Sequence, residues 1–247
     1  MLITTRDGYV AVMTIDRPDR RNALGSELIS SFDKAFQTLE HDDHVRAIIV
    51  TGAPPGFCAG SDLKELGMMD IPGMCRHEAL TAALARSIGL LSKPVIAAVE
   101  GFALGGGFAF ATSCDLVVTG ENCRWHMPEV MIGWIPPWGL ESLVARCGPV
   151  AARRLTWGSE PIDGREAERL GVADYVVPDG SAVAEAQALA KRLAALPLPA
   201  VAATKQYFAA AVAGLGEPRD VEANRMFAEN CRHEVAKATL KQFGIKA

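Results

Sequence analysis

The composition of the chain is that of an ordinary globular protein. Its 247 residues are 49% hydrophobic and 22% charged, which excludes a disordered tail protein and allows one large domain or two small ones. The formal net charge of −4 provides no basic excess to neutralise phosphates, so we expect no nucleic-acid partner.

The most apolar stretch, residues 94–118, does not predict a membrane span. Glu100 and Asp115 interrupt it, and the uncharged part between them is shorter than the roughly 20 apolar residues that a span needs. We expect no secretory signal, and no two of the six cysteines stand at C-x-x-C spacing, which is typical of reduced thiols in a cytoplasmic protein. His41 and His44 lie in a polar turn, and we predict no metal site.

The first half of the chain alternates strands with helices, which predicts an α/β fold with buried, mostly parallel strands. The predicted elements in chain order are a strand over residues 9–15, a helix that Ser26 caps, a strand over 45–51, a helix over 78–91 and a strand over 95–99.

Three successive glycines, Gly105 to Gly107, follow the strand at 95–99 and open an apolar helix over 108–113. Glycine lets a ligand approach the backbone closely, and a helix start presents free N–H groups at the positive end of its dipole. The turn therefore suits an oxyanion or a phosphate, although close packing of a helix on a strand explains it equally well. It is not a dinucleotide fingerprint, because Phe110 stands where glycine or alanine is required.

A second turn, FCAGSDLKE at residues 57–65, also lies between an apolar strand and a helix. Its small residues again expose backbone N–H groups. Two such turns from adjacent strands can direct two donors at one carbonyl oxygen. That is the geometry of an oxyanion hole, in which each donor is worth about 3 kcal/mol to the transition state.

The second half of the chain becomes increasingly helical. After a strand over 115–118, Pro136 and Pro137 predict a loop over 134–139. The remaining predicted elements are a helix that Asp163 caps, a short strand over 171–177, and alanine-rich helices from Ser181 onward with a hinge at 196–199.

Taken together, these motifs resemble the crotonase (enoyl-CoA hydratase/isomerase) superfamily over nearly the whole chain. The residues that carry the resemblance are RNAL at 21–24, FCAGSDLKE at 57–65, KPVIAAVEGFALGGG at 93–107, Pro128-Glu129 with Gly133 after it, and GREA at 164–167 through GVAD at 171–174.

The resemblance implies a particular architecture and substrate. The expected fold is α/β, with a crotonase-like β-β-α superhelix over residues 1–190 and a C-terminal helical region over 191–247 for trimerisation and for covering the active site. The expected assembly is a homotrimer or a hexamer, built as a dimer of trimers. The implied substrate is an acyl-CoA thioester, with coenzyme A as part of the substrate and no permanently bound cofactor.

The resemblance also implies site residues by their position in the motifs. The backbone N–H groups of Ser61 and Gly106 correspond to the oxyanion hole that stabilises a thioester enolate. The implied coenzyme A contacts are Arg21, Ala23, Ala59, Ser61, Asp62, Leu63, Lys64 and Gly106.

Hydratases of the family hold one water between two glutamates, and this chain matches only one of the two positions. Glu129 stands at the second position, whereas Ala109 stands at the first. Addition of water needs one group for the water and one for the α-proton, whereas a single carboxylate can shuttle a proton between Cα and Cγ.

The leading interpretation is therefore enoyl-CoA double-bond isomerisation, with Glu129 as the single acid/base. One alternative is an enoyl-CoA hydratase or hydratase-lyase, for example on an aromatic acyl-CoA, with an incomplete carboxylate pair. Decarboxylation and C–C hydrolysis are further enzymatic alternatives. The contrasting alternative is a non-catalytic acyl-CoA-binding member of the family.

Four residues are candidates for an acyl pocket: Met68, His126, Trp134 and Trp138. The two tryptophans can wall a flat acyl group or pack at a subunit interface. His126 can be a second acid–base group or a packed histidine at a strand end. Met68 falls in the region that caps the acyl pocket in the family.

Overall fold

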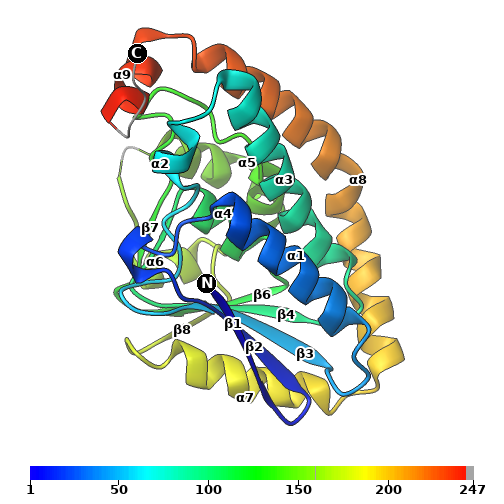
Figure 1. Cartoon of the computed structure of the whole chain (residues 1–247). Coiled ribbons are helices and arrows are strands. Elements are labelled where there is room, and N and C mark those ends of the chain that lie inside the picture. The colour runs from blue at the N-terminus through cyan, green and yellow to red at the C-terminus, as the bar shows by residue number, and fades with distance from the viewer. Residues whose placement is uncertain (159, 243–247) are drawn as a thin grey trace.

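Figure 1 shows a large sheet with helices on both of its faces and the long helix α8 running along one side of the molecule. This computed structural model describes residues 1–158 and 160–242. Its strands are β1 (Leu2–Asp7), β2 (Val10–Ile15), β3 (Ala47–Gly52), β4 (Val95–Val99), β5 (Phe102–Leu104), β6 (Leu116–Gly120), β7 (Arg124–His126) and β8 (Tyr175–Val177). Its helices are the 3-10 turn η1 (Pro18–Arg20), α1 (Ser26–Glu40), α2 (Leu63–Leu66), α3 (Ile71–Leu90), α4 (Gly106–Thr112), α5 (Leu140–Trp157), α6 (Gly164–Arg169), α7 (Ala182–Ala194), α8 (Leu198–Asn230) and α9 (Glu234–Gln242).

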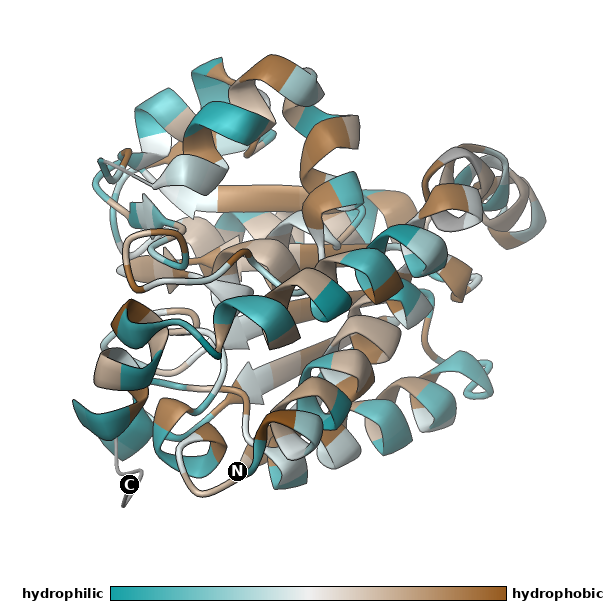
Figure 2. Cartoon of the chain, turned by 90° about the horizontal axis from the view of Figure 1, so that it is seen from above, coloured by the Kyte–Doolittle hydropathy of each residue, from teal (hydrophilic) through white to brown (hydrophobic). Residues whose placement is uncertain are grey.

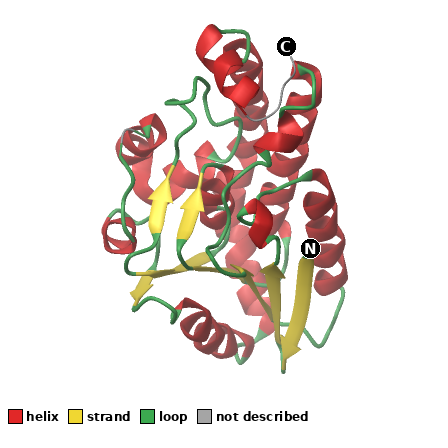
Figure 3. Ribbon diagram, turned by 60° about the vertical axis from the view of Figure 1, so that its left-hand side comes forward, coloured by secondary structure: helices red, strands yellow, loops and turns green. Residues whose placement is uncertain are grey.

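The large sheet has the strand order β1-β2-β3-β4-β6-β8. Strand β1 is antiparallel to β2, and every other pair of neighbours is parallel. Strands β5 and β7 form a separate parallel pair, which stands steeply against the large sheet in Figure 3. The predicted α/β class with a helical C-terminal part is therefore confirmed.

Alternate residues of the central strands face two different layers of the core. On β3, Ala47 and Ile49 belong to a cluster with the alanine-rich helix α7, whereas Ile48 and Val50 face the main cluster with α1 and α3. In Figure 2 the strands between these layers are mainly brown, and the outer helices carry the teal segments. Burial on both faces explains why these strands are continuously apolar in the sequence.

The predicted start of α3 is wrong. The helix begins at Ile71 rather than near Glu78, because the Asp70 side chain accepts a hydrogen bond from the N–H of Gly73 at 2.7 Å and Pro72 occupies its first turn. The prediction began the helix near its middle. Glu78 therefore lies well inside a long helix instead of at its exposed end.

Two smaller boundary predictions are also wrong, and one cap is confirmed. Gly25 rather than Ser26 is the N-cap of α1, because the Ser26 hydroxyl donates to Glu65 instead. The strand predicted over 171–177 is reduced to β8, because Gly171 adopts a φ of +79° in a turn. The Asp163 cap of α6 is confirmed, since its carboxylate accepts from the N–H of Glu166 at 2.8 Å.

The turn between α1 and β3 carries the two histidines considered as metal ligands. His41 and His44 are both exposed there, and Nδ1 of His41 contacts the carbonyl oxygen of Gln37 at 2.8 Å. Across residues 1–158 and 160–242, no group of three or more metal-ligating side chains comes together. Over the same residues, no helix combines the length and apolar character needed to cross a bilayer.

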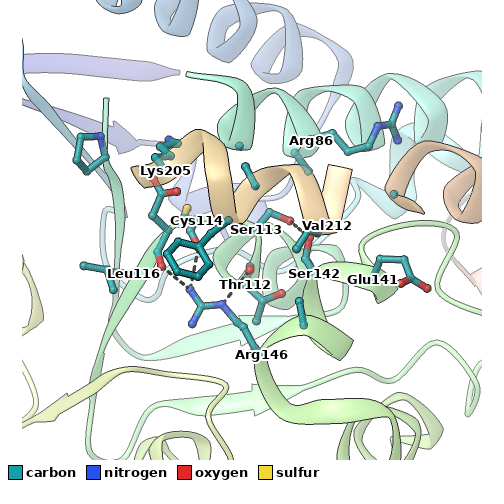
Figure 4. A pocket seen from close by; sticks show the side chains of 18 of the residues that line it. Arg86, Thr112, Ser113, Cys114, Leu116, Glu141, Ser142, Arg146, Lys205 and Val212 are labelled. Atoms are coloured by element: carbon teal, nitrogen blue, oxygen red, sulfur yellow. Dashed lines mark hydrogen bonds and ion pairs between the residues drawn. The ribbon is translucent and has the colours of Figure 1, made fainter. Parts of the chain in front are cut away.

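Arg146 of α5 joins the end of α4 to the start of β6. Its guanidinium donates to the carbonyl oxygens of Thr112 at 3.0 Å and Cys114 at 2.7 Å, and it pairs with Asp174 at 3.0 Å. Figure 4 shows this side chain at the floor of a cavity of about 950 Å³, which lies between α5, α8 and the second half of α3. Arg146 therefore fixes α4, the helix that begins at the glycine turn.

Replacing Arg146 by methionine is expected to lower the free energy of unfolding by about 3 kcal/mol, because it leaves carbonyl groups inside the fold without their charged donor. Arg146→Lys keeps the charge but not the planar set of donors, so its loss should be smaller. Urea unfolding followed by circular dichroism measures both changes. A methionine variant as stable as the parent would contradict this role.

Candidate active site

Three short parallel segments bring the predicted site residues together at the edge where all three segments end. Strand β5 pairs with β7, and the chain before Ser61 joins the other side of β5 through a parallel bridge at Cys58. Because the three segments run in the same direction, they end at the same edge, where α/β proteins place their ligands. The residues that follow the three ends are Ser61, Gly106 and Glu129.

Glycines allow the two turns to touch. A Cβ added to Gly60 would lie 2.8 Å from the backbone nitrogen of Gly106, closer than real side chains approach another atom. Gly105 has a φ of +52°, and a Cβ there would lie 2.7 Å from Oε1 of Glu129. The glycines of this turn therefore do allow close packing, one of the two explanations considered for them. The packing occurs at the same place as the predicted N–H donors.

The backbone N–H groups of Ser61 and Gly106 are available to a ligand. Leu24 bonds the residues on either side of Ser61: its N–H donates to the carbonyl of Gly60 at 2.8 Å, and its carbonyl accepts from the N–H of Asp62 at 3.0 Å. Successive N–H groups of an extended segment point to opposite sides, so that of Ser61 points away from Leu24. Gly106 is the first residue of α4, so its N–H has no acceptor within the helix.

Glu129 is buried next to this pair of turns, with 7% of its surface exposed. Its Oε2 has no hydrogen-bond partner among the residues that the structure describes. Burial raises the pKa of Glu129 from its ordinary 4.5 to about 7, and repulsion from Glu78 contributes to the shift. A carboxyl group that exchanges its proton near neutral pH suits acid–base catalysis.

A second carboxylate, that of Glu78 in α3, lies in the same cavity as Glu129. The sequence analysis did not identify it as a site residue. Only 2% of its surface is exposed, and its Oε2 accepts a hydrogen bond from the indole N–H of Trp138 at 2.7 Å. Burial raises the pKa of Glu78, while the charge of His77 and the donors Ser61 and Trp138 lower it.

A sequence signal for Glu78 existed. Met74, Glu78 and Ala82 stand four residues apart and are all buried, so a charged residue interrupts an apolar helix stripe. The misplaced start of α3 hid this pattern.

Ala109 also lines the site, and the loop that carries Trp138 and Gly139 packs against it. A Cβ added to Gly139 would lie only 2.7 Å from the Cβ of Ala109. Glycine at position 139 therefore lets this loop pack closely on Ala109, and Glu78 lines the same cavity from α3.

The two carboxylates and the two turns line one cavity of about 70 Å³. Its polar lining includes Ser61, Gly106, Glu78 and Glu129. Its apolar wall includes Leu66, Ile132, Trp134, Trp138 and Phe227. The rings of Trp134 and Phe227 pack edge to face with their centroids 5.7 Å apart, which places α8 against the site.

Only two of the four acyl-pocket candidates line the cavity. Trp134 and Trp138 line the cavity, whereas Met68 is 78% exposed and does not. His126 also lies outside the cavity lining, and its Nε2 contacts the carbonyl oxygen of Gly158 at 2.8 Å. That contact supports the packed-histidine interpretation of His126.

The residues expected to contact coenzyme A differ in their exposure and in the interactions that their side chains already make. Ala59 and Leu63 line the cavity, Ala23 is buried, and Lys64 is exposed beside them. The exposed Arg21 places its guanidinium over the Phe102 ring, 4.6 Å from the centroid. Asp62 is engaged elsewhere: its carboxylate caps α2 and pairs with Arg17 at 3.2 Å.

Comparisons with protein families, curated relatives and solved structures all point to the same family. The family model described as enoyl-CoA hydratase/isomerase matches residues 5–246. The chain is 36% identical over 207 residues to the short-chain-enoyl-CoA hydratase of Clostridium acetobutylicum, covering 83% of this chain and 79% of that protein. It is 31% identical over 247 residues to the 2,3-dehydroadipyl-CoA hydratase of Escherichia coli, covering 98% and 96%. Among solved structures, carnitinyl-CoA hydratase from Mycobacterium avium aligns with a TM-score of 0.86 and 34% identity, covering 98% and 94%.

Replacing Glu129 by glutamine is expected to stabilise the fold at neutral pH. Because the pKa is about 7 in the folded protein and ordinarily 4.5, the unfolded chain releases this proton first as the pH rises. The parent protein therefore loses stability across this range, by about 3 kcal/mol once the pH exceeds 7.

The glutamine variant lacks this titration, so the two proteins should be similarly stable in mild acid and differ most above neutral pH. Urea unfolding at several pH values measures the difference. A variant with no stability advantage in mildly alkaline buffer would show that Glu129 is not held as described.

Proposed function

Because the chain belongs to the enoyl-CoA hydratase/isomerase family, we propose that it transfers protons at Cα of an enoyl-CoA thioester through an enolate, with Glu129 as an acid–base group. The observation that carries the proposal is the buried Glu129 carboxyl, whose Oε2 lacks a partner among the described residues, beside the Ser61 and Gly106 turns.

The two turns supply the electrostatic part of the reaction. When a proton leaves or joins Cα, negative charge develops on the thioester oxygen. N–H donors from Ser61 and Gly106 stabilise that charge, each by about 3 kcal/mol, and they need no reorganisation because the backbone already holds them. The apolar wall lowers the local dielectric constant and so strengthens these interactions.

Two reactions follow from this step. In isomerisation, Glu129 takes a proton from Cα of a 3-enoyl thioester and returns it to Cγ, and no second group is needed. In hydration, a water oxygen bonds to Cβ of a 2-enoyl thioester, and Cα gains a proton. The first remains the leading interpretation from the sequence, and the names of the hydratase relatives favour the second.

The segment from Ser61 to Lys64 is proposed to bind the coenzyme A part of the substrate. Leu63 lines the cavity, and the exposed cations of Lys64 and Arg21 suit phosphate groups. Asp62 acts indirectly in this proposal, since its carboxylate caps α2 and pairs with Arg17.

We also propose that the chain forms a homotrimer or a dimer of trimers through its C-terminal helical region, residues 191–247, of which 243–247 lie outside the described residues. Tyr207 and Phe208 of α8 are exposed and stack edge to face, 5.3 Å between centroids. Adjacent exposed aromatic rings are typical of surfaces that a partner covers.

Mass spectrometry of 2-enoyl- and 3-enoyl-CoA thioesters incubated in ¹⁸O-labelled water tests the function. A product heavier by one labelled water identifies hydration, and a product of unchanged mass but new retention time identifies isomerisation. Glu129→Gln should lower either turnover at least about 100-fold, because it removes an acid–base group, while thioester binding persists.

The matched control is Glu185→Gln, which alters a surface carboxylate of α7 and should leave the rate unchanged. An undiminished rate in Glu129→Gln would contradict the mechanism. Tight thioester binding without any Cα exchange in heavy water would instead support the non-catalytic alternative.

A further inference from the structure

The proton shuttle by Glu129 leaves one feature of the cavity without a purpose. Glu78 is a carboxylate buried in a largely apolar wall, and a buried carboxylate is costly unless its environment or its function compensates. Isomerisation through Glu129 alone does not need it. No substrate contact is implied for Glu78 by the sequence motifs either, because it lies outside all of them.

We propose that Glu78 is the second acid–base group of this cavity, and that it activates the water that adds to Cβ of the enoyl thioester. The chain is then a hydratase whose second carboxylate comes from α3 rather than from position 109. This inference rests on the proposed enolate chemistry of Glu129 and extends it.

The geometry supports this role in three ways. Glu78 and Glu129 line the same cavity but come from different elements, α3 and the turn after β7, so they approach it independently. The cavity of about 70 Å³ exceeds the space that one water needs. The small side chain of Ala109 is also part of its lining, so this position adds no competing polar group.

The two carboxylates differ in the groups that surround them, and this difference suggests which is the base and which is the acid. Burial raises the pKa of both carboxyl groups, but Glu78 has contacts that oppose the rise: the charge of His77, the Ser61 hydroxyl and the indole N–H of Trp138 at 2.7 Å. Oε2 of Glu129 has no hydrogen-bond partner within the described part of the chain, and the charge of Glu78 further favours the neutral form of Glu129. This difference in hydrogen-bond partners favours Glu78 as the base and Glu129 as the acid.

The proposed addition of water conserves atoms and charge. The Glu78 carboxylate removes a proton from the water as its oxygen bonds to Cβ. The electron pair of the Cα–Cβ double bond moves to the thioester, and the resulting enolate is held by the N–H groups of Ser61 and Gly106. The neutral Glu129 then donates its proton to Cα. Proton exchange with solvent returns both carboxyl groups to their starting states.

Glu78→Gln tests the role of the side chain with little change of shape. The amide oxygen of glutamine can still accept the N–H of Trp138, so the loop position is preserved. We expect ¹⁸O incorporation from labelled water into trans-2-butenoyl-CoA to fall at least about 100-fold, the typical contribution of an acid–base group. Exchange of the Cα protons of butanoyl-CoA in heavy water, which needs only Glu129 and the two donors, should remain within a few-fold of the parent rate.

The outcomes separate this inference from the function on which it rests. If the parent protein exchanges no Cα protons, the enolate chemistry fails and the role of Glu78 fails with it. If exchange needs Glu129 but hydration persists in Glu78→Gln, only the role of Glu78 is overturned. Loss of both reactions in Glu78→Gln would also overturn it, because the side chain would then serve the site as a whole. Glu185→Gln is again the surface control.

A second variant keeps the test decisive if Glu78→Gln does not fold. Trp138→Phe leaves both carboxylates in place but removes the N–H that favours ionised Glu78. The acidic limb of the pH profile for hydration should then move to higher pH, because Glu78 holds its proton more tightly. The charged, titratable and polar side chains that interact with Glu78 include Glu129, His77, Ser61, Cys75, Cys231 and Trp138, and this variant changes only Trp138. An unmoved acidic limb would contradict the assignment of Glu78 as the base.

Discussion

The contact between two glycine turns is the constraint on which the rest of the site depends. Gly60 meets the backbone of Gly106, and Gly105 meets the carboxyl group of Glu129, at distances that leave no room for a Cβ. Because no side chains intervene, two backbone donors and one carboxyl group share a small cavity. The parallel arrangement of β5, β7 and the segment before Ser61 holds this contact in place.

Two carboxylates in one apolar cavity are costly to the fold, and this cost is in keeping with the acid–base roles that we propose for them. Burial raises the pKa of both groups, and their mutual repulsion adds to the shift of Glu129. Proteins keep such destabilising arrangements mainly at functional sites. Hydrogen bonds elsewhere in the fold, such as those from Arg146 to the end of α4, hold the helix that begins at the glycine turn.

Local sequence patterns predicted the elements well where a single signal dominated. The strand at 95–99 has the bounds of β4, and Asp163 caps α6 as its position before the helix indicated. The start of α3 was mispredicted because Asp70 and Pro72, an N-cap and a first-turn proline, precede a stretch with a weak apolar period. Similarly, the choice between Gly25 and Ser26 as N-cap depended on Glu65, a distant side chain that takes the serine hydroxyl.

By itself, the sequence determined the α/β class and the family, and it identified the two turns and Glu129 as candidate site residues. These depend on neighbouring residues and on motifs that can be recognised in a linear chain. Only the tertiary structure decided that Glu78 enters the same cavity, that His126 contacts Gly158 instead, and that Met68 lies on the surface. The physical reason is that a side chain's partners across the fold depend on how α3, β7 and the loop of Trp138 pack together, and no local pattern specifies that packing.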